Sequence, residues 1–150
     1  MSLSNQDKQR LLAEIRNANV KVLAVSTKLL DKLNITQHLP PAVLSLLHEN
    51  VNTFYVFHDV YHDIPGKHEY DGLSTVHVYP DTGRRIAGIG LADTVLDVDI
   101  EYQTFLVLHE LCHLVSGEGE HTELFHAVLD KLIEQTNTFS GFHIENDYCK

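Results

Sequence analysis

The segment His109-Glu110-Leu111-Cys112-His113 lies within an apolar stretch and limits what this chain can fold into more than any other feature. It has the form H-E-x-x-H. On a helix, residues four apart lie on one face, one turn from each other, so both imidazoles can reach a single metal ion. The Glu110 carboxylate follows the first histidine, where it can hold and deprotonate a metal-bound water. The segment therefore favours a zinc hydrolase, and a peptidase first among these.

The surrounding residues predict a helix over about 99–116. Apolar side chains recur at helical spacing before and within the motif, at Phe105, Leu108, Cys112 and Val115. Asp97 or Asp99 can cap the start of this helix, and Gly117 can end it. The chain holds 11 histidines, so a core helix with two incidental histidines is the alternative interpretation of the motif.

A catalytic zinc ion usually has three protein ligands and one open position, so a third ligand is needed. Gly117 and Gly119 let the chain turn sharply beyond the motif helix, and His121 follows, just before a helix that Thr122 can cap. We predict His121 as the third ligand. Four other residues nearby remain alternatives: Glu118, Glu120, Glu123 and His126.

Two segments together resemble the SprT-like zinc metallopeptidases, and in particular their short bacterial relatives without a zinc ribbon. The first is 109–114, which reads H-E-L-C-H-L. The second is 121–129, in which a histidine, a small hydroxyl residue (Thr122) and an aromatic residue (Phe125) open the next helix. The hairpin expected before the motif helix is also similar to that family.

The resemblance implies a zincin-like minimal metallopeptidase domain that acts on a peptide or protein substrate. It also implies Zn²⁺ as the cofactor and Glu110 as the catalytic base. The ligands that it implies for the metal are His109, His113 and His121.

Length and composition predict one soluble domain over residues 1–150. The formal net charge of -10 and the scattered basic residues disfavour nucleic acid as a partner. No apolar run is long enough to span a membrane, and no secretory signal is evident. The two cysteines form no disulfide framework, so we expect a reducing, cytoplasmic location.

Hydrophobic periodicity predicts an α+β fold with N-terminal helices and a small antiparallel sheet. The expected helices cover residues 5–17, 20–33, 41–51, 99–116 and 122–136, with an irregular tail over 137–150. The expected strands cover 52–57, 73–79 and 85–91, with a polar loop over 58–72. Gly88-Ile89-Gly90 is expected on an edge strand beside the cleft, where an extended peptide could add as a further strand.

Other functions and residues stay open on the sequence alone. A YbeY-like metal-dependent RNA-processing hydrolase is one alternative, although that family usually has glycine where Glu110 stands. An inactive, zinc-stabilised binding module is another, and it would need a fourth ligand from His77 or His143. His58 and His62 are spaced like a second metal site, but Pro65-Gly66 favours a solvated loop there. The candidates for stabilising an oxyanion are Tyr102, His77, His143 and Tyr148.

Overall fold

A computed structural model of the chain describes residues 22–58 and 71–146 and confirms a mixed α+β fold. The predicted helix over 5–17, together with His62, Tyr148 and Cys149, lies outside the described residues. The elements in chain order are β1 (Val22–Val25), α2 (Leu29–Lys32), the 3-10 helix η1 (Thr36–His38), α3 (Pro41–Asn50), β2 (Thr53–Phe57), β3 (Gly72–Val78), β4 (Arg85–Ala92), the 3-10 helix η2 (Asp93–Asp97), α4 (Ile100–Ser116) and α5 (Glu123–Ser140).

The strands form a four-stranded sheet in the order β1-β2-β4-β3. β1 and β2 are antiparallel, and so are β3 and β4, which form a hairpin. The prediction of an antiparallel sheet is wrong for the central pair, because β2 and β4 run parallel, with Thr53 opposite Gly88 and Phe57 opposite Ala92. The hairpin brings β4 back in the same direction as β2. The buried run over 87–92 is typical of a strand that is covered on both faces.

The expected edge position of Gly88-Ile89-Gly90 is therefore wrong. β4 lies inside the sheet between β2 and β3, and β3 is the edge strand. Small residues suit the inner position, because the ring of Tyr55 on β2 lies directly over β4. A Cβ atom on Gly90 would come within 2.3 Å of the Cε2 atom of Tyr55.

The predicted helix over 20–33 is wrong in its first half. Residues Val22–Val25 form β1, which pairs with β2, and only Leu29–Lys32 are helical. Valines three residues apart fit either a strand or a helix, but β-branched residues favour the strand when a partner strand is available. At the other end of the chain, α5 is longer than predicted and continues to Ser140.

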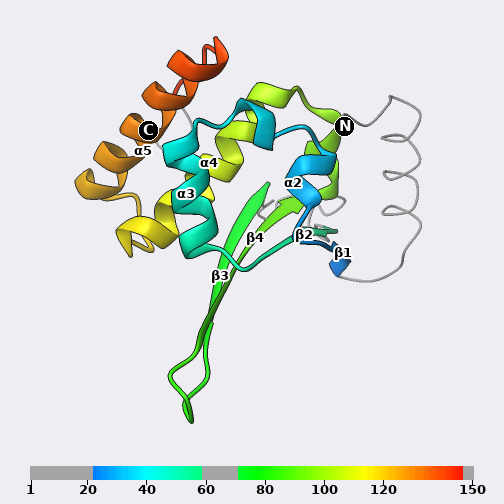
Figure 1. Cartoon of the computed structure of the whole chain (residues 1–150), viewed down its shortest axis with the longest axis vertical. Helices are drawn as coiled ribbons and strands as arrows, with labels where there is room; N and C mark the ends of the chain where they lie inside the picture. Colours follow the sequence, from blue (N-terminus) through cyan, green and yellow to red (C-terminus); the bar gives the residue numbers. More distant parts are fainter. Residues whose placement is uncertain (1–21, 59–70, 147–150) are drawn as a thin grey trace, which may run out of the picture.

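The buried apolar side chains of the helices and the sheet form one connected cluster. α4 contributes most of its apolar face to this cluster, with Leu108 and Leu111 fully buried against the sheet and α5. Figure 1 shows the helices gathered at one end of the molecule, and α4 contacts both α3 and α5. The motif helix is therefore held by contacts with both neighbouring helices and with β3 and β4.

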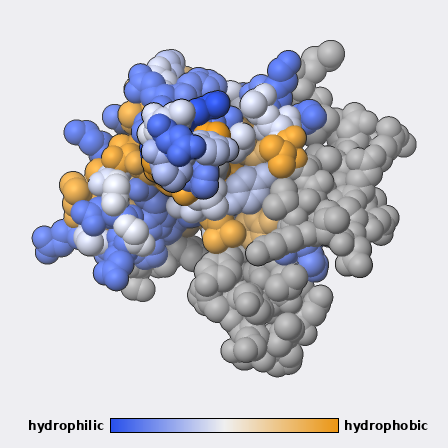
Figure 2. Space-filling view, turned by 90° about the horizontal axis from the view of Figure 1, so that it is seen from below, coloured by the Kyte–Doolittle hydropathy of each residue, from blue (hydrophilic) through white to orange (hydrophobic). Residues whose placement is uncertain are grey.

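The far part of the β3–β4 hairpin, residues 75–85, extends away from the helices, and we call it the arm (Figure 1). Every residue of the arm is exposed, including Val76, Val78 and Tyr79. In Figure 2, seen from the side of the arm, the described surface is mostly hydrophilic, with small separate apolar areas. Within residues 22–58 and 71–146, no helix has the length and apolar character needed to cross a bilayer.

Candidate metal centre

The ends of α4 fix where the two motif histidines lie. The side chain of Asp99 accepts a hydrogen bond of 2.9 Å from the backbone N–H of Tyr102, and Gly117 ends the helix with a φ of 71°. Both caps agree with the prediction. Because Leu108, Leu111 and Cys112 are fully buried, the helix cannot rotate without emptying the core. His109 and His113 are thereby kept together on the face that borders a cleft.

Three imidazoles meet at this face, and together they could hold a metal ion. The Nε2 atoms of His109 and His113 are 3.3 Å apart. Two nitrogens that share a tetrahedral zinc ion at about 2.0–2.1 Å are about 3.3–3.4 Å from each other. His121 completes the group, and one ligand atom from each of the three histidines lies within 4.8 Å of the other two.

The orientation of His113 is set by the turn that follows α4. Its Nδ1 atom lies 2.7 Å from the backbone carbonyl oxygen of Glu118. Since a carbonyl oxygen only accepts, Nδ1 must carry the proton, and in the neutral ring Nε2 then keeps its lone pair. Hydrogen bonds of this kind orient metal-binding histidines in many proteins. Glu118 thus takes part through its backbone.

The third histidine is placed by the start of α5. The Thr122 hydroxyl accepts a hydrogen bond of 3.2 Å from the N–H of Phe125, which confirms the predicted N-cap. The buried Phe125 ring lies beneath the group, with its centroid 5.2, 4.4 and 4.7 Å from those of His109, His113 and His121. His121, which precedes the Thr122 cap, and Phe125, which packs against the three imidazoles, are therefore both positioned by the same end of α5.

The carboxyl group of Glu110 lies between α4 and the beginning of β3. Only 5% of this residue is exposed, and burial raises its pKa to about 7. A Cβ atom on Gly72 would be 3.3 Å from the Cγ atom of Glu110, so glycine allows β3 to approach the glutamate closely. A carboxyl group with a pKa near neutrality can both accept and return a proton at physiological pH.

The protonation of the histidines also suits a metal site. Burial, reinforced by the neighbouring His113, His121 and His126, lowers the pKa of His109 to about 4. The pKa of His121 is lowered as well, by partial burial and then by His113 and His126. Both rings are therefore neutral near pH 7, which is the form that binds a metal ion.

A cleft of about 730 Å³ runs past the three histidines and Glu110. One side is formed by α4 and by the turn that follows it, through Tyr102, Phe105, Leu106, His109, Glu110, His113 and Leu114 of the helix and Gly117, Glu118, Gly119 and His121 beyond it. The other side is formed by the hairpin and the residue before it, through Asp71, Gly72, Leu73, Ser74, Val76 and Arg85. The cleft is thus bounded by the motif helix and by the edge strand β3.

The competing third ligands do not join the histidine group. Among the described residues, the group holds no carboxylate and no fourth histidine, so Glu118, Glu120, Glu123 and His126 lie outside it. Instead, the Nδ1 atom of His126 lies 3.3 Å from the side-chain nitrogen of Asn146. Only His121 of the predicted alternatives is close enough to share one ion with the motif histidines.

Of the residues considered for an oxyanion, the cleft contains Tyr102 but not His77 or His143. The Tyr102 hydroxyl donates a hydrogen bond to the carboxylate of Asp71. His77 is exposed on the arm, where its ring packs on Tyr79 with centroids 4.5 Å apart. Asp71 falls within the polar loop predicted over 58–72, and no local pattern marks its contact with Tyr102, because the two residues are 31 positions apart.

His58, the first residue of the possible second metal site, has a different partner. Its Nδ1 atom lies 2.9 Å from the Oδ2 atom of Asp93, a buried carboxylate at the start of η2. The rest of that segment, residues 59–70, lies outside the described residues. The pair anchors the end of β2 to η2, which follows β4 directly.

No family model, curated protein or solved structure matches this chain. Support for a function therefore comes from the arrangement of the side chains themselves.

Proposed function

We propose that this protein is a zinc-dependent hydrolase that cleaves peptide bonds, with a zincin-like arrangement of motif helix and edge strand. The observation that carries the proposal is the convergence of three imidazoles with a buried glutamate in one cleft. The SprT-like resemblance leads to the same activity and stays a prediction.

His109, His113 and His121 would hold the ion. Neutral imidazoles are good ligands for zinc, and the spacing of 3.3 Å between the first two Nε2 atoms matches tetrahedral coordination. When bound, zinc would lower the pKa of a water ligand towards neutrality and polarise the carbonyl group of a substrate. Three protein ligands leave one position open for this chemistry, whereas a purely structural site usually has four.

Glu110 is the proposed general base. Its carboxylate can take the proton of the attacking water and then deliver it to the leaving amine. The close approach of Gly72 shields Glu110 from solvent and keeps its pKa near neutral, so that either step is accessible near pH 7. No other carboxylate follows a motif histidine directly, since Leu114 comes after His113.

The proposed substrate is an extended peptide that lies along β3. This strand is at the edge of the sheet, with β4 as its neighbour on one side, and its residues Gly72, Ser74 and Val76 line the cleft. A peptide can add to such an edge through main-chain hydrogen bonds. β3 thus takes the role that we had expected for Gly88-Ile89-Gly90.

The other functions find less support. An RNA-processing hydrolase would have to bring phosphates to a chain with a net charge of -10. A closed structural zinc site would need a fourth ligand, and within the described residues neither His77 nor His143 is part of the histidine group.

Metal content and hydrolysis, measured on the same samples, test the proposal. Wild type, Glu110→Gln and His121→Ala should be analysed for bound zinc and assayed on casein and on single-stranded RNA. We expect about one zinc ion per chain in wild type and Glu110→Gln, with casein cleavage in wild type alone. Zinc retained in full by His121→Ala would exclude this residue as a ligand. Cleavage of RNA but not of casein would overturn the peptidase proposal.

A further inference from the structure

Arg85 lies in the cleft beyond the metal centre, and its position bears on which peptides would bind. We propose that Arg85 is a specificity-determining residue that selects substrates with an acidic side chain several residues from the cleaved bond. The inference rests on the proposed peptidase function and names the substrate class for that site.

The register of the hairpin gives the separation between Arg85 and the catalytic residues. Gly72, at the start of β3, contacts Glu110, whereas Arg85 is opposite Val78, six residues further along β3. At about 3.3 Å per residue, these two ends of β3 are roughly 20 Å apart. An Arg side chain can reach back along the strand by part of that distance. A substrate residue beside Val76 or Val78 would thus be about four to six residues from the cleaved bond.

Arg85 is the one permanent cation among the described residues that line the cleft. The acidic residues of the cleft are Asp71, Glu110 and Glu118, which lie on or beside α4 and at the beginning of β3. On the hairpin side of the cleft, Val76 lies between the beginning of β3 and Arg85, and none of the lining residues from Gly72 to Arg85 is acidic. Charge therefore changes sign along the hairpin side of the cleft, and an acidic substrate group is attracted towards the Arg85 end of that side.

The guanidinium group of Arg85 is positioned but not neutralised. One of its nitrogens, Nη1, donates to the backbone carbonyl oxygen of Asn50 at the end of α3, at 3.5 Å. No described carboxylate forms an ion pair with Arg85. A guanidinium has five N–H donors in a planar fork, so enough remain to bind both oxygens of a carboxylate.

A peptide scan on the zinc-loaded, full-length protein tests the inference. One cleavable peptide is made in a series in which a single glutamate replaces glutamine at each position in turn. We expect one position, four to six residues from the cleaved bond, at which glutamate raises kcat/KM about fivefold, as for a partly exposed ion pair. Arg85→Gln should abolish this preference. Arg85→Glu should replace it with a preference for lysine, measured with one further peptide that carries lysine at the same position.

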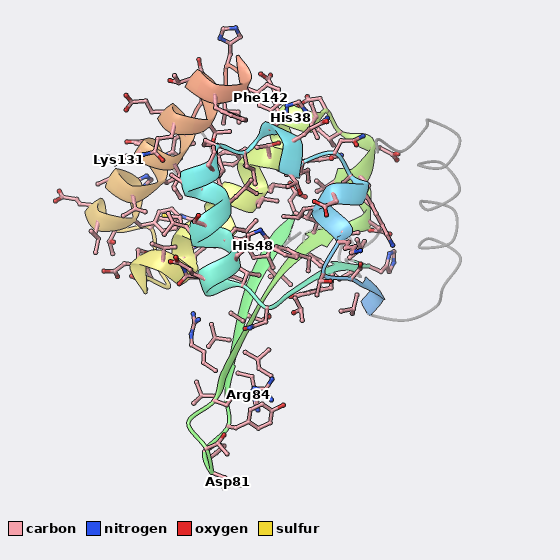
Figure 3. All side chains as sticks on the ribbon, in the orientation of Figure 1. His38, His48, Asp81, Arg84, Lys131 and Phe142 are labelled. Atoms are coloured by element: carbon pink, nitrogen blue, oxygen red, sulfur yellow. The ribbon has the colours of Figure 1, made fainter. Side chains whose placement is uncertain are left out.

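Arg84→Gln is the matched control, since Arg84 is the preceding arginine and does not line the cleft. Figure 3 shows Arg84 on the arm, near Asp81 at its tip. This variant should keep the wild-type preference, and all variants should keep the wild-type zinc content. A flat scan, or a glutamate preference that survives in Arg85→Gln, would overturn the inference while leaving the peptidase function standing. If none of the peptides is cleaved by the wild type, the peptidase proposal and this inference both fail.

Discussion

The two sides of the cleft are built in different ways. On one side, residues 109–125 of α4, α5 and the turn between them rest on fully buried side chains such as Leu108, Leu111 and Phe125. On the other side, the arm has Val76 and Val78 half exposed and contacts little beyond its own hairpin. Residues that could share an ion need fixed positions, and the packed core supplies them. Residues that select a substrate can lie on an exposed strand, where substitutions cost little stability.

The largest expected difference between the two sides is in zinc binding. His113→Ala should weaken zinc binding by more than about 100-fold and abolish hydrolysis, because it removes an imidazole that Glu118 orients towards the other two. His77→Ala, an exposed histidine on the arm, should leave both unchanged. Competition with a chromophoric chelator measures the affinities. If His113→Ala and His77→Ala weakened zinc binding equally, the histidine group on α4 would not be the zinc site.

The pH dependence of stability should reveal Glu110 in the metal-free protein. Because burial raises its pKa to about 7, the folded chain binds a proton more tightly than the unfolded chain, and this contribution to stability is lost as pH rises from about 4.5 to 7. The loss is on the order of 3 kcal/mol. The lowered pKa of His109 acts in the opposite direction between about pH 4 and 6.5.

Denaturant unfolding of wild type and Glu110→Gln over this pH range separates the two contributions, since His109 is common to both. Glu110→Gln should become more stable relative to wild type as the pH rises. A pH-independent difference between the two proteins would show that the carboxyl group is not buried as described.

A substitution on the inner part of the hairpin should cost more stability than the same substitution at a glycine with open space around it. Gly90→Ala should lower the free energy of unfolding by about 1–3 kcal/mol, because the new Cβ would lie 2.3 Å from the Tyr55 ring. Gly119→Ala is the control, as its Cβ would meet no atom within 4 Å. Combining Gly90→Ala with Tyr55→Leu should recover part of the loss in a double-mutant cycle. Strict additivity would mean that the ring is not the cause.

The smallest expected effect on stability is at an exposed valine of the arm, and a buried valine of α4 provides the comparison. Val78, which is 53% exposed on the arm, should change stability by less than about 0.5 kcal/mol when replaced by alanine. Val107 is fully buried in α4, and the same replacement there should cost about 2 kcal/mol through lost packing. Thermal or denaturant unfolding can compare them directly. A large effect at Val78 would show that the arm is packed against something in solution.

The sequence predicted those parts of the site that depend on local structure. The motif histidines, the caps Asp99 and Thr122, and the glycine that ends α4 follow from helical spacing and capping preferences, and the structure confirms these caps and this helix end. His121 could be predicted as the third metal ligand, ahead of the nearby alternatives, because two glycines precede it and a helix follows. Each of these features involves residues close together in the chain.

What could not be predicted depends on contacts between distant segments. The strand Val22–Val25 was mistaken for a helix because its spacing fits both, and only pairing with β2 decides between them. The same holds for the parallel pairing of β2 with β4, which moves Gly88 and Gly90 away from the sheet edge. Gly72 and Asp71 contact Glu110 and Tyr102 across more than thirty residues, and no local pattern marks such contacts.

The position of Phe125 has a consequence for experiments in solution. Its ring lies beside all three imidazoles at centroid distances of 4.4–5.2 Å, close enough for its π-electron circulation to displace their proton resonances. The imidazole signals of His109, His113 and His121 should thus separate from those of the other histidines in a nuclear magnetic resonance spectrum. The arrangement of the site can then be followed residue by residue during a zinc titration, with no added probe.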